Sequence, residues 1–287
     1  MTRMSFAEAA RRALAEEMRR DALVWALGED LAQGGIFGQY KGLAEEFGPE
    51  RIVSTPISES TIMGAGLGAA LCGTRPVVEM RIADFTLCAM DELVSQIAKA
   101  RYMFGGQGRA ALVVRMPQGM WRNSAAQHSQ CLEAWLTHIP GLVVAAPGTP
   151  ADAAALLKSA IRSDDPVVLM EPKNLWTAEG EVPEEVAPIP FGVARHAARG
   201  DALTVVTWSA CVPAVEQGAA DSGIACDVFD LRSLWPWDEA AVIASARRTG
   251  RLLVVHEAVT VSGFGAEIVA RVVEALGPGG LRAVERL

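Results

Sequence analysis

The chain has 287 residues, of which 51% are hydrophobic and 6% aromatic, and its formal net charge is −8. This length suffices for two domains with full cores, and an acidic chain without a basic face or arm argues against a nucleic-acid partner. No apolar block marks a signal peptide at the start, and the apolar stretch 62–73 is too short and too rich in glycine to span a membrane.

The five cysteines are scattered along the chain, odd in number and never spaced as Cys-x-x-Cys. That pattern argues against a zinc site and against a disulfide framework. We therefore expect reduced thiols and a cytoplasmic protein.

Short apolar runs alternate with stretches of helical spacing in the first part of the chain. The runs predict buried strands at 23–27, 52–55, 77–82, 112–115, 142–146 and 167–171. Helical spacing predicts helices over 5–19, 87–102 and 151–162. Strands separated by helices pair in parallel with helices on both faces, so the predicted fold class is α/β.

The segment 179–190 is rich in proline and glutamate and has no helical period, which predicts a linker. The alternation then restarts, with strands expected at 203–207, 226–230, 252–256 and 281–285 and helices at 214–221, 239–248 and 266–276. We therefore expect two domains, a larger one over 1–178 and a smaller one over 191–287.

The run Gly64-Ala-Gly66-Leu-Gly68-Ala69 fits the loose glycine fingerprint of dinucleotide-binding sites, and Asp84 follows about twenty residues after it. In that fingerprint the glycine turn must follow a strand directly, whereas here 56–63 intervene after the strand 52–55. The spacing favours a helix with small residues on one face. A dinucleotide-dependent oxidoreductase remains an alternative.

Four residues follow predicted strands and are candidates for chemistry. They are Glu29 in Leu-Gly-Glu-Asp, Glu59 in Thr-Pro-Ile-Ser-Glu, Phe85 after Asp84, and His128 in Gln-His-Ser-Gln. Taken singly, they are typical of a loop acid, a helix cap, a core residue and a surface histidine. Taken together, a carboxylate in an apolar setting and a histidine in a polar loop suit acid–base chemistry on a bound cofactor.

These motifs resemble the beta subunits of the thiamin-diphosphate-dependent 2-oxo-acid dehydrogenases, which include the pyruvate, branched-chain and acetoin enzymes. The resemblance covers nearly the whole chain and includes Lys99-Ala-Arg-Tyr-Met, Asp230-Leu-Arg-Ser-Leu and Val255-His-Glu-Ala. It implies a transketolase-like pyrimidine-binding domain followed by a smaller transketolase C-terminal-like domain. It also implies decarboxylation of a 2-oxo acid and transfer of the acyl or aldehyde unit to a lipoyl group or a small acceptor.

The resemblance assigns a role to each candidate. Glu59 would hydrogen-bond the aminopyrimidine of the cofactor and help to deprotonate its thiazolium carbon, an effect that seclusion from water strengthens. Phe85 would lie flat against the same ring. Glu29 would belong to a proton-sharing network nearby, and His128 would act at the substrate end of the thiazolium.

The chain lacks the Gly-Asp-Gly and downstream Asn that bind the diphosphate and its Mg²⁺ in this family. The resemblance therefore implies an alpha subunit that carries this motif, an alpha2-beta2 heterotetramer, and a lipoyl-bearing acyltransferase as a further partner. A catalytically silent assembly subunit is a third alternative, although the presence of both Glu59 and His128 speaks against it.

The resemblance also implies a structural K⁺ ion, because hard monovalent cations suit cages of backbone carbonyls. The matching positions are Leu112, Ala160, Ile161 and Asp165, and Ser163 stands where relatives often have Asp.

Two departures from the family pattern stand out. Met120, Trp121 and Arg122 occupy a loop that is rich in glycine in relatives and borders the expected substrate entrance, which suggests a changed substrate or acceptor. The chain also ends at Leu287, where relatives continue, which favours a two-subunit enzyme outside a multienzyme complex.

Overall fold

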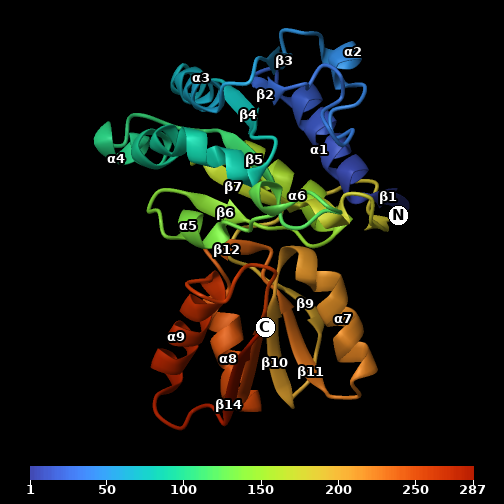
Figure 1. The fold of residues 1–287 in the computed structure, drawn as a ribbon, viewed down its shortest axis with the longest axis vertical. Helices are drawn as coiled ribbons and strands as arrows, with labels where there is room; N and C mark the ends of the chain where they lie inside the picture. The colour runs from blue at the N-terminus through green and yellow to red at the C-terminus, as the bar shows by residue number, and fades with distance from the viewer.

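The computed structural model describes residues 1–287 and contains two α/β units stacked along the long axis (Figure 1). The larger unit holds a seven-stranded sheet with the order β12-β6-β7-β5-β4-β2-β3. All its neighbouring strands are parallel except β12. The parallel strands are β2 (Val24–Glu29), β3 (Ile52–Thr55), β4 (Arg75–Glu79), β5 (Val113–Gln118), β6 (Val143–Ala145) and β7 (Val167–Pro172).

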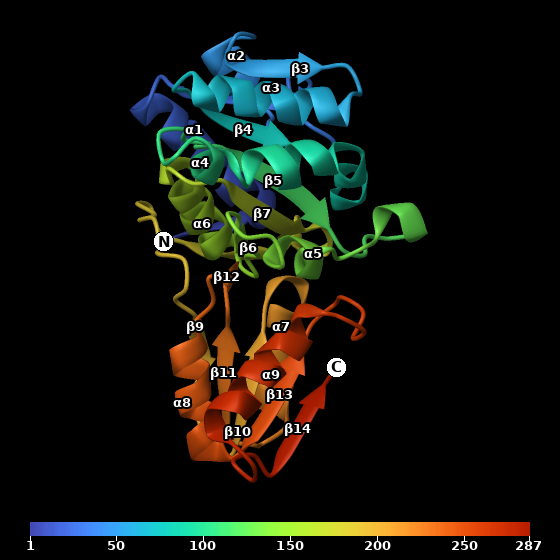
Figure 2. The ribbon, with the colours of Figure 1, turned by 90° about the vertical axis from the view of Figure 1, so that its left-hand side faces the viewer.

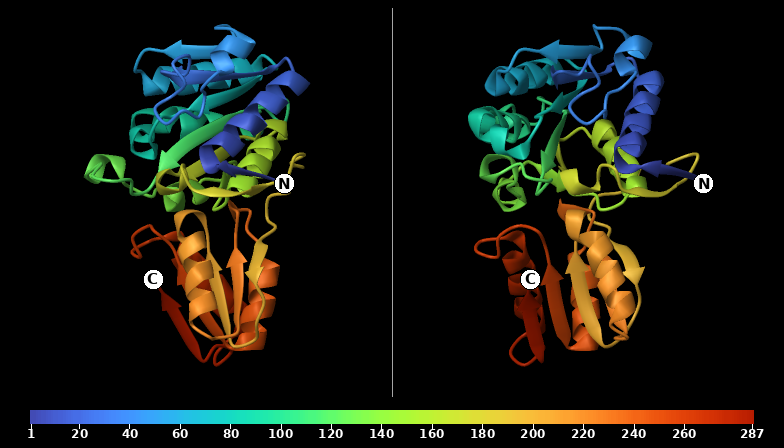
Figure 3. Two further views of the ribbon diagram at one scale, coloured as in Figure 1. Left: turned by 90° about the vertical axis from the view of Figure 1, so that its right-hand side faces the viewer. Right: turned by 45° about the vertical axis from the view of Figure 1, so that its right-hand side comes forward.

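Helices cover both faces of this sheet, as Figures 2 and 3 show. On one face α1 (Phe6–Arg20) packs on α6 (Pro150–Arg162), and on the other lies α3 (Glu59–Leu71). Helix α1 begins at a capping box in which Ser5 and Glu8 bond each other's backbone N–H. Two short helices, α2 (Leu43–Phe47) and α5 (Glu133–Thr137), lie in connecting loops.

The single helix predicted over 87–102 is wrong in form. The chain instead makes a 3₁₀ helix, η1 (Ala83–Ala89), a π-helix, η2 (Asp91–Ile97), and a short α4 (Ala100–Met103). The buried residues Ala89, Leu93, Ile97 and Ala100 are spaced by four, four and three. Spacings of three and four place these residues on one face, so the segment buries one apolar side as the predicted helix would.

The segment predicted as a linker begins with a strand, contrary to that prediction. β8 (Glu179–Val182) pairs antiparallel with β1 (Thr2–Ser5), and neither strand was expected. Val182 is fully buried, and Arg3 donates a hydrogen bond to Glu179 across the pair. A separate two-stranded sheet of this kind leaves no local sequence signal, because its strands are short and far apart in sequence.

The smaller unit holds a five-stranded sheet with the order β14-β13-β10-β11-β9, in which only β9 is antiparallel to its neighbour. Its strands are β9 (Arg195–Ala198), β10 (Leu203–Thr207), β11 (Cys226–Asp230), β13 (Arg251–Val255) and β14 (Ala283–Arg286). Its helices are α7 (Val212–Asp221), α8 (Glu239–Thr249) and α9 (Phe264–Leu276). The predicted α/β fold class is confirmed.

One strand joins the two units. β12 (Ser233–Trp235) follows β11 of the smaller sheet and pairs antiparallel with β6 at the edge of the larger sheet. The buried Trp208 Nε1 donates to Glu133 Oε1 at 3.1 Å across the same boundary. No helix of the structure is both long and apolar enough to cross a bilayer.

Candidate active site

The four candidate residues lie at one edge of the larger sheet. Glu29 ends β2, Glu59 follows β3, Phe85 follows β4 and His128 follows β5. Because β2, β3, β4 and β5 run parallel, their carboxyl ends meet at the same edge, where ligands of open α/β sheets usually bind. Residues from four separate segments of the chain thus lie along one edge of the sheet.

Glu59 is the first residue of α3 and is half-buried. The close fit of this helix on the sheet depends on a glycine, since a Cβ atom on Gly66 would lie 2.6 Å from Val78 Cγ2. The run 64–69 lies inside α3, and Glu59 opens the helix four residues after β3 ends. The predicted helix is confirmed, and the glycines do not form the strand-to-helix turn that a dinucleotide site requires.

Phe85 and His128 touch each other. Their rings meet edge to face with centroids 5.2 Å apart, and both side chains are half-buried. Next to them Gln130 Nε2 donates to Asp84 Oδ1 at 2.7 Å, while the buried Asp84 Oδ2 has no hydrogen-bond partner. An unsatisfied buried carboxylate oxygen is costly, so this oxygen is free to accept one more hydrogen bond.

Glu29 is almost fully buried and is paired. Arg81 Nη1 donates to Glu29 Oε2 at 3.0 Å and to Asp30 Oδ2 at 2.8 Å. Arg81 has a φ of 47°, a left-handed conformation that is uncommon for a non-glycine residue. These hydrogen bonds fix the Glu29 carboxylate near the strand ends.

A buried ionic cluster under this edge was missed by the sequence reasoning. Arg115 donates to both carboxylate oxygens of Glu171, at 3.0 and 2.8 Å, and the Tyr40 hydroxyl donates to Glu79 Oε2 at 2.9 Å. Burial raises the pKa of Glu79 from 4.5 to about 7. The sequence contained one signal for this cluster, which is the presence of charged residues inside predicted strands. Glu79 and Arg115 are such residues, and they are paired neighbours on β4 and β5.

The loop after β5 holds the three large residues that depart from the family pattern. Met120 is 66% exposed, and its backbone N–H donates to Glu257 Oε1 of the smaller domain at 2.6 Å. Trp121 is half-buried, and its ring meets Phe37 edge to face at 4.8 Å in the wall of a cavity of about 980 Å³ that Trp176 also lines. Arg122 lies over the Trp121 ring at 4.9 Å.

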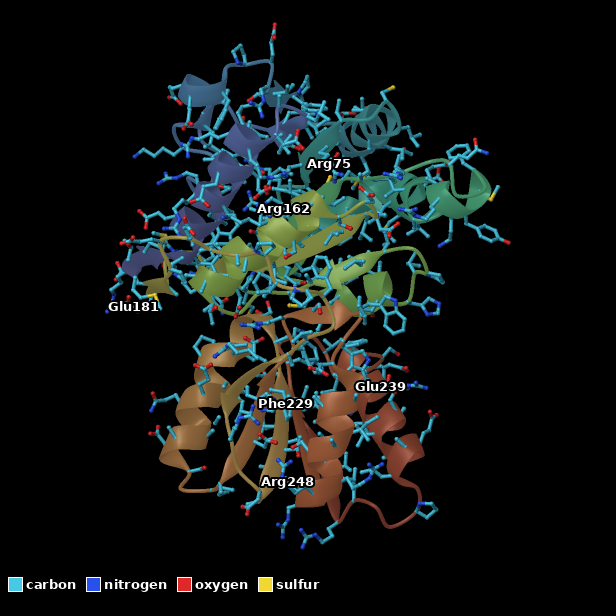
Figure 4. All side chains as sticks on the ribbon, turned by 180° about the vertical axis from the view of Figure 1, so that it is seen from behind. Arg75, Arg162, Glu181, Phe229, Glu239 and Arg248 are labelled. Atoms are coloured by element: carbon cyan, nitrogen blue, oxygen red, sulfur yellow. The ribbon has the colours of Figure 1, made fainter.

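The positions expected to bind K⁺ already make hydrogen bonds within the chain. Leu112 O accepts from Val167 N at 3.1 Å, and Ala160 O accepts from Ser163 N at 3.2 Å. Arg75, labelled in Figure 4, donates to Ile161 O at 3.1 Å and to Ser163 O at 2.9 Å. The carbonyl of Asp165 accepts from Ser163 Oγ at 2.9 Å. Each carbonyl has a second lone pair, so the potassium site stays a prediction.

Comparisons with known proteins place both units in one family. Residues 2–178 match the transketolase pyrimidine-binding domain, and residues 192–287 match the transketolase C-terminal domain. Over 99% of its length the chain also superposes on a split-gene transketolase, described as an inactive beta4 tetramer, with a TM-score of 0.79, 23% identity and 87% coverage of that chain. At this identity the superposition shows the shared fold.

Relatives of higher identity share the same two-domain span. A 2-oxoisovalerate dehydrogenase subunit beta of Bacillus subtilis is 40% identical over 96% of this chain and 85% of that protein. The beta subunit of an acetoin:2,6-dichlorophenolindophenol oxidoreductase of Cupriavidus necator is 42% identical over 95% of this chain and 84% of that protein. A mitochondrial 2-oxoisovalerate dehydrogenase subunit beta of Chaetomium thermophilum is 43% identical over 95% of this chain, which spans 60% of its length.

The motifs at the strand ends, the two domain matches and the 40–43% identity to these relatives agree. The chain belongs to the family of beta subunits of the 2-oxo-acid and acetoin dehydrogenases, within the larger transketolase fold family.

Proposed function

We propose that this chain is the pyrimidine-binding subunit of a two-component thiamin-diphosphate enzyme that decarboxylates a 2-oxo acid and passes on the acyl or aldehyde unit. One observation carries the proposal. Glu59, Phe85 and His128 come from three different segments and lie at the carboxyl edge of one parallel sheet, with Phe85 and His128 in contact. The names of the relatives support the same chemistry.

The residues at this edge fit the pyrimidine end of the cofactor. They offer a half-buried carboxylate at Glu59, a half-buried aromatic ring at Phe85 and the unpartnered buried oxygen of Asp84. The diphosphate and its Mg²⁺ need a second binding element, since this chain has no Gly-Asp-Gly. When bound, thiamin diphosphate supplies the carbon nucleophile and the electron sink for decarboxylation.

The chain's own residues would then hold and move protons. Glu59 would accept a hydrogen bond from a ring nitrogen, and its charge would act strongly because the partly buried helix start limits screening by water. Phe85 would fix the plane of the ring. His128 would exchange a proton with the substrate unit, and Arg81 would hold the Glu29 carboxylate in place nearby.

The proposed partner is an alpha subunit that carries the Gly-Asp-Gly and downstream Asn, in an alpha2-beta2 assembly. The candidate residues lie along an open sheet edge, so a second subunit would supply the facing wall and exclude water. A lipoyl-bearing acyltransferase as acceptor, the structural K⁺ ion and a cytoplasmic location also belong to this proposal.

The test is co-expression with a chain that carries the Gly-Asp-Gly motif, followed by assay of carbon dioxide release from pyruvate and branched 2-oxo acids. Glu59→Gln should lower turnover about 100-fold or more, because general acid–base and charge effects of this kind contribute that much. Glu239→Gln is the matched control, since Glu239 is also the first residue of a helix but lies in the smaller domain (Figure 4). Equal turnover in wild type and Glu59→Gln would point to a silent assembly subunit.

A further inference from the structure

The loop that carries His128 is closed at its base. The backbone N–H of Gly119, just after β5, donates to Gln130 O at 3.1 Å, so residues 119–130 form one loop whose two ends are hydrogen-bonded at the sheet edge. His128 lies near the end of this loop in the short 3₁₀ helix η3 (Ala126–His128). The imidazole can keep its position against Phe85 only if this part of the loop is held.

Lys173 lies where it can hold that part. It begins the short helix η4 (Lys173–Leu175) directly after β7, the neighbour of β5 in the sheet. The side chain is 2% exposed, and its ammonium donates a hydrogen bond to the backbone carbonyl of His128. A lysine this deeply buried is rare unless its charge is compensated.

The surroundings of Lys173 carry that compensation. Burial lowers the pKa of Lys173, while the nearby charge of Asp84 and Glu257 acts in the opposite direction. Asp84 is also the acceptor for Gln130 Nε2, and Glu257 is the acceptor for the backbone N–H of Met120. Two carboxylates thus accept hydrogen bonds from the two ends of the loop, and their charges favour the protonated form of Lys173.

We propose that Lys173 is a positioning residue for His128, whose backbone it fixes so that the imidazole stays edge-on to Phe85. Only the expected loss of turnover rests on the proposed function, whereas the effect on the loop does not depend on it. Lys173 itself does not touch the reacting atoms. Without its donor, His128 loses the hydrogen bond that ties its backbone to the segment after β7, and the imidazole leaves the geometry required for proton transfer.

The experiment uses the enzyme assembled with its alpha subunit and compares Lys173→Met with Lys158→Met. Lys158 is the matched control, since it is also buried and its Nζ donates to the backbone carbonyl of Val186 at 2.8 Å, but it lies on α6 away from the loop. Amide hydrogen exchange of 119–131 is measured without cofactor, and turnover and KM are measured with it.

We expect Lys173→Met to speed exchange in 119–131 about tenfold and to lower turnover about 100-fold with little change in KM. Lys158→Met should change neither the exchange of this loop nor the turnover. If Lys173→Met fails to assemble, Lys173→Gln takes its place. It keeps a polar donor and should give the same changes to a smaller degree. The double variant Lys173→Met/His128→Ala should be no slower than His128→Ala, because Lys173 acts through His128.

Unchanged exchange in 119–131, or rate losses that multiply in the double variant, would overturn the proposal. If no 2-oxo acid is turned over by the wild type, the proposed function fails, and hydrogen exchange alone then decides whether Lys173 holds the loop.

Discussion

Removing the Arg115 guanidinium should be among the most damaging single changes to the larger domain. Arg115 is 1% exposed and Glu171 fully buried, and two charge-assisted hydrogen bonds join them. Arg115→Met would leave the Glu171 carboxylate without a counter-charge in the interior, and Glu79 is close by, 3.8 Å from the guanidinium. Breaking one side of a buried pair costs about 3–5 kcal/mol.

The assay is the thermal midpoint of the assembled enzyme. At about 2 °C per kcal/mol for a chain of this size, the midpoint should fall by about 6–10 °C. The control is Arg3→Met, because Arg3 bonds Glu179 at the same distance of 2.8 Å but their side chains are 70% and 56% exposed. That change should cost below about 1 kcal/mol. Similar shifts for the two variants would refute the role assigned to burial.

Three further outcomes are expected. Burial raises the pKa of Glu79 to about 7, so the folded state keeps a proton that the unfolded chain releases above about 4.5. The free energy of unfolding therefore falls as pH rises between these two values. The thermal midpoint of wild type, relative to that of Glu79→Gln, should be higher at about pH 5 than at about pH 7.5. Gly66→Ala should lower the midpoint because the new Cβ meets Val78 at 2.6 Å, and adding Val78→Ala should restore part of the loss. Replacing 120–122 by glycines should change the rate of acyl transfer to a lipoyl domain, whereas equally high rates in both forms would reject a role in acceptor choice.

The fold class could be predicted because buried parallel strands appear as continuous apolar runs. β3, β10 and β11 occur at the expected residues, and the other predicted strands overlap the observed ones. The capping residues before α1 and α6 also mark where those helices begin. These signals are local, so a single sequence contains them.

Features that depend on distant pairing could not be predicted in this way. β12 is three residues long and is stabilised as a strand by β6 of the other domain, and β8 depends on β1. The same holds for the site. The motifs marked Glu29, Glu59, Phe85 and His128 as candidates, but Arg81 and Lys173, which donate hydrogen bonds to Glu29 and to the backbone of His128, belong to no motif.

The most direct test of the central claim is a crystal structure of the assembled enzyme with bound thiamin diphosphate. The account predicts that the Glu59 carboxylate lies within hydrogen-bond distance, about 2.6–3.2 Å, of a nitrogen of the aminopyrimidine ring. A Glu59 side chain that faces solvent, with the ring bound elsewhere, would contradict it.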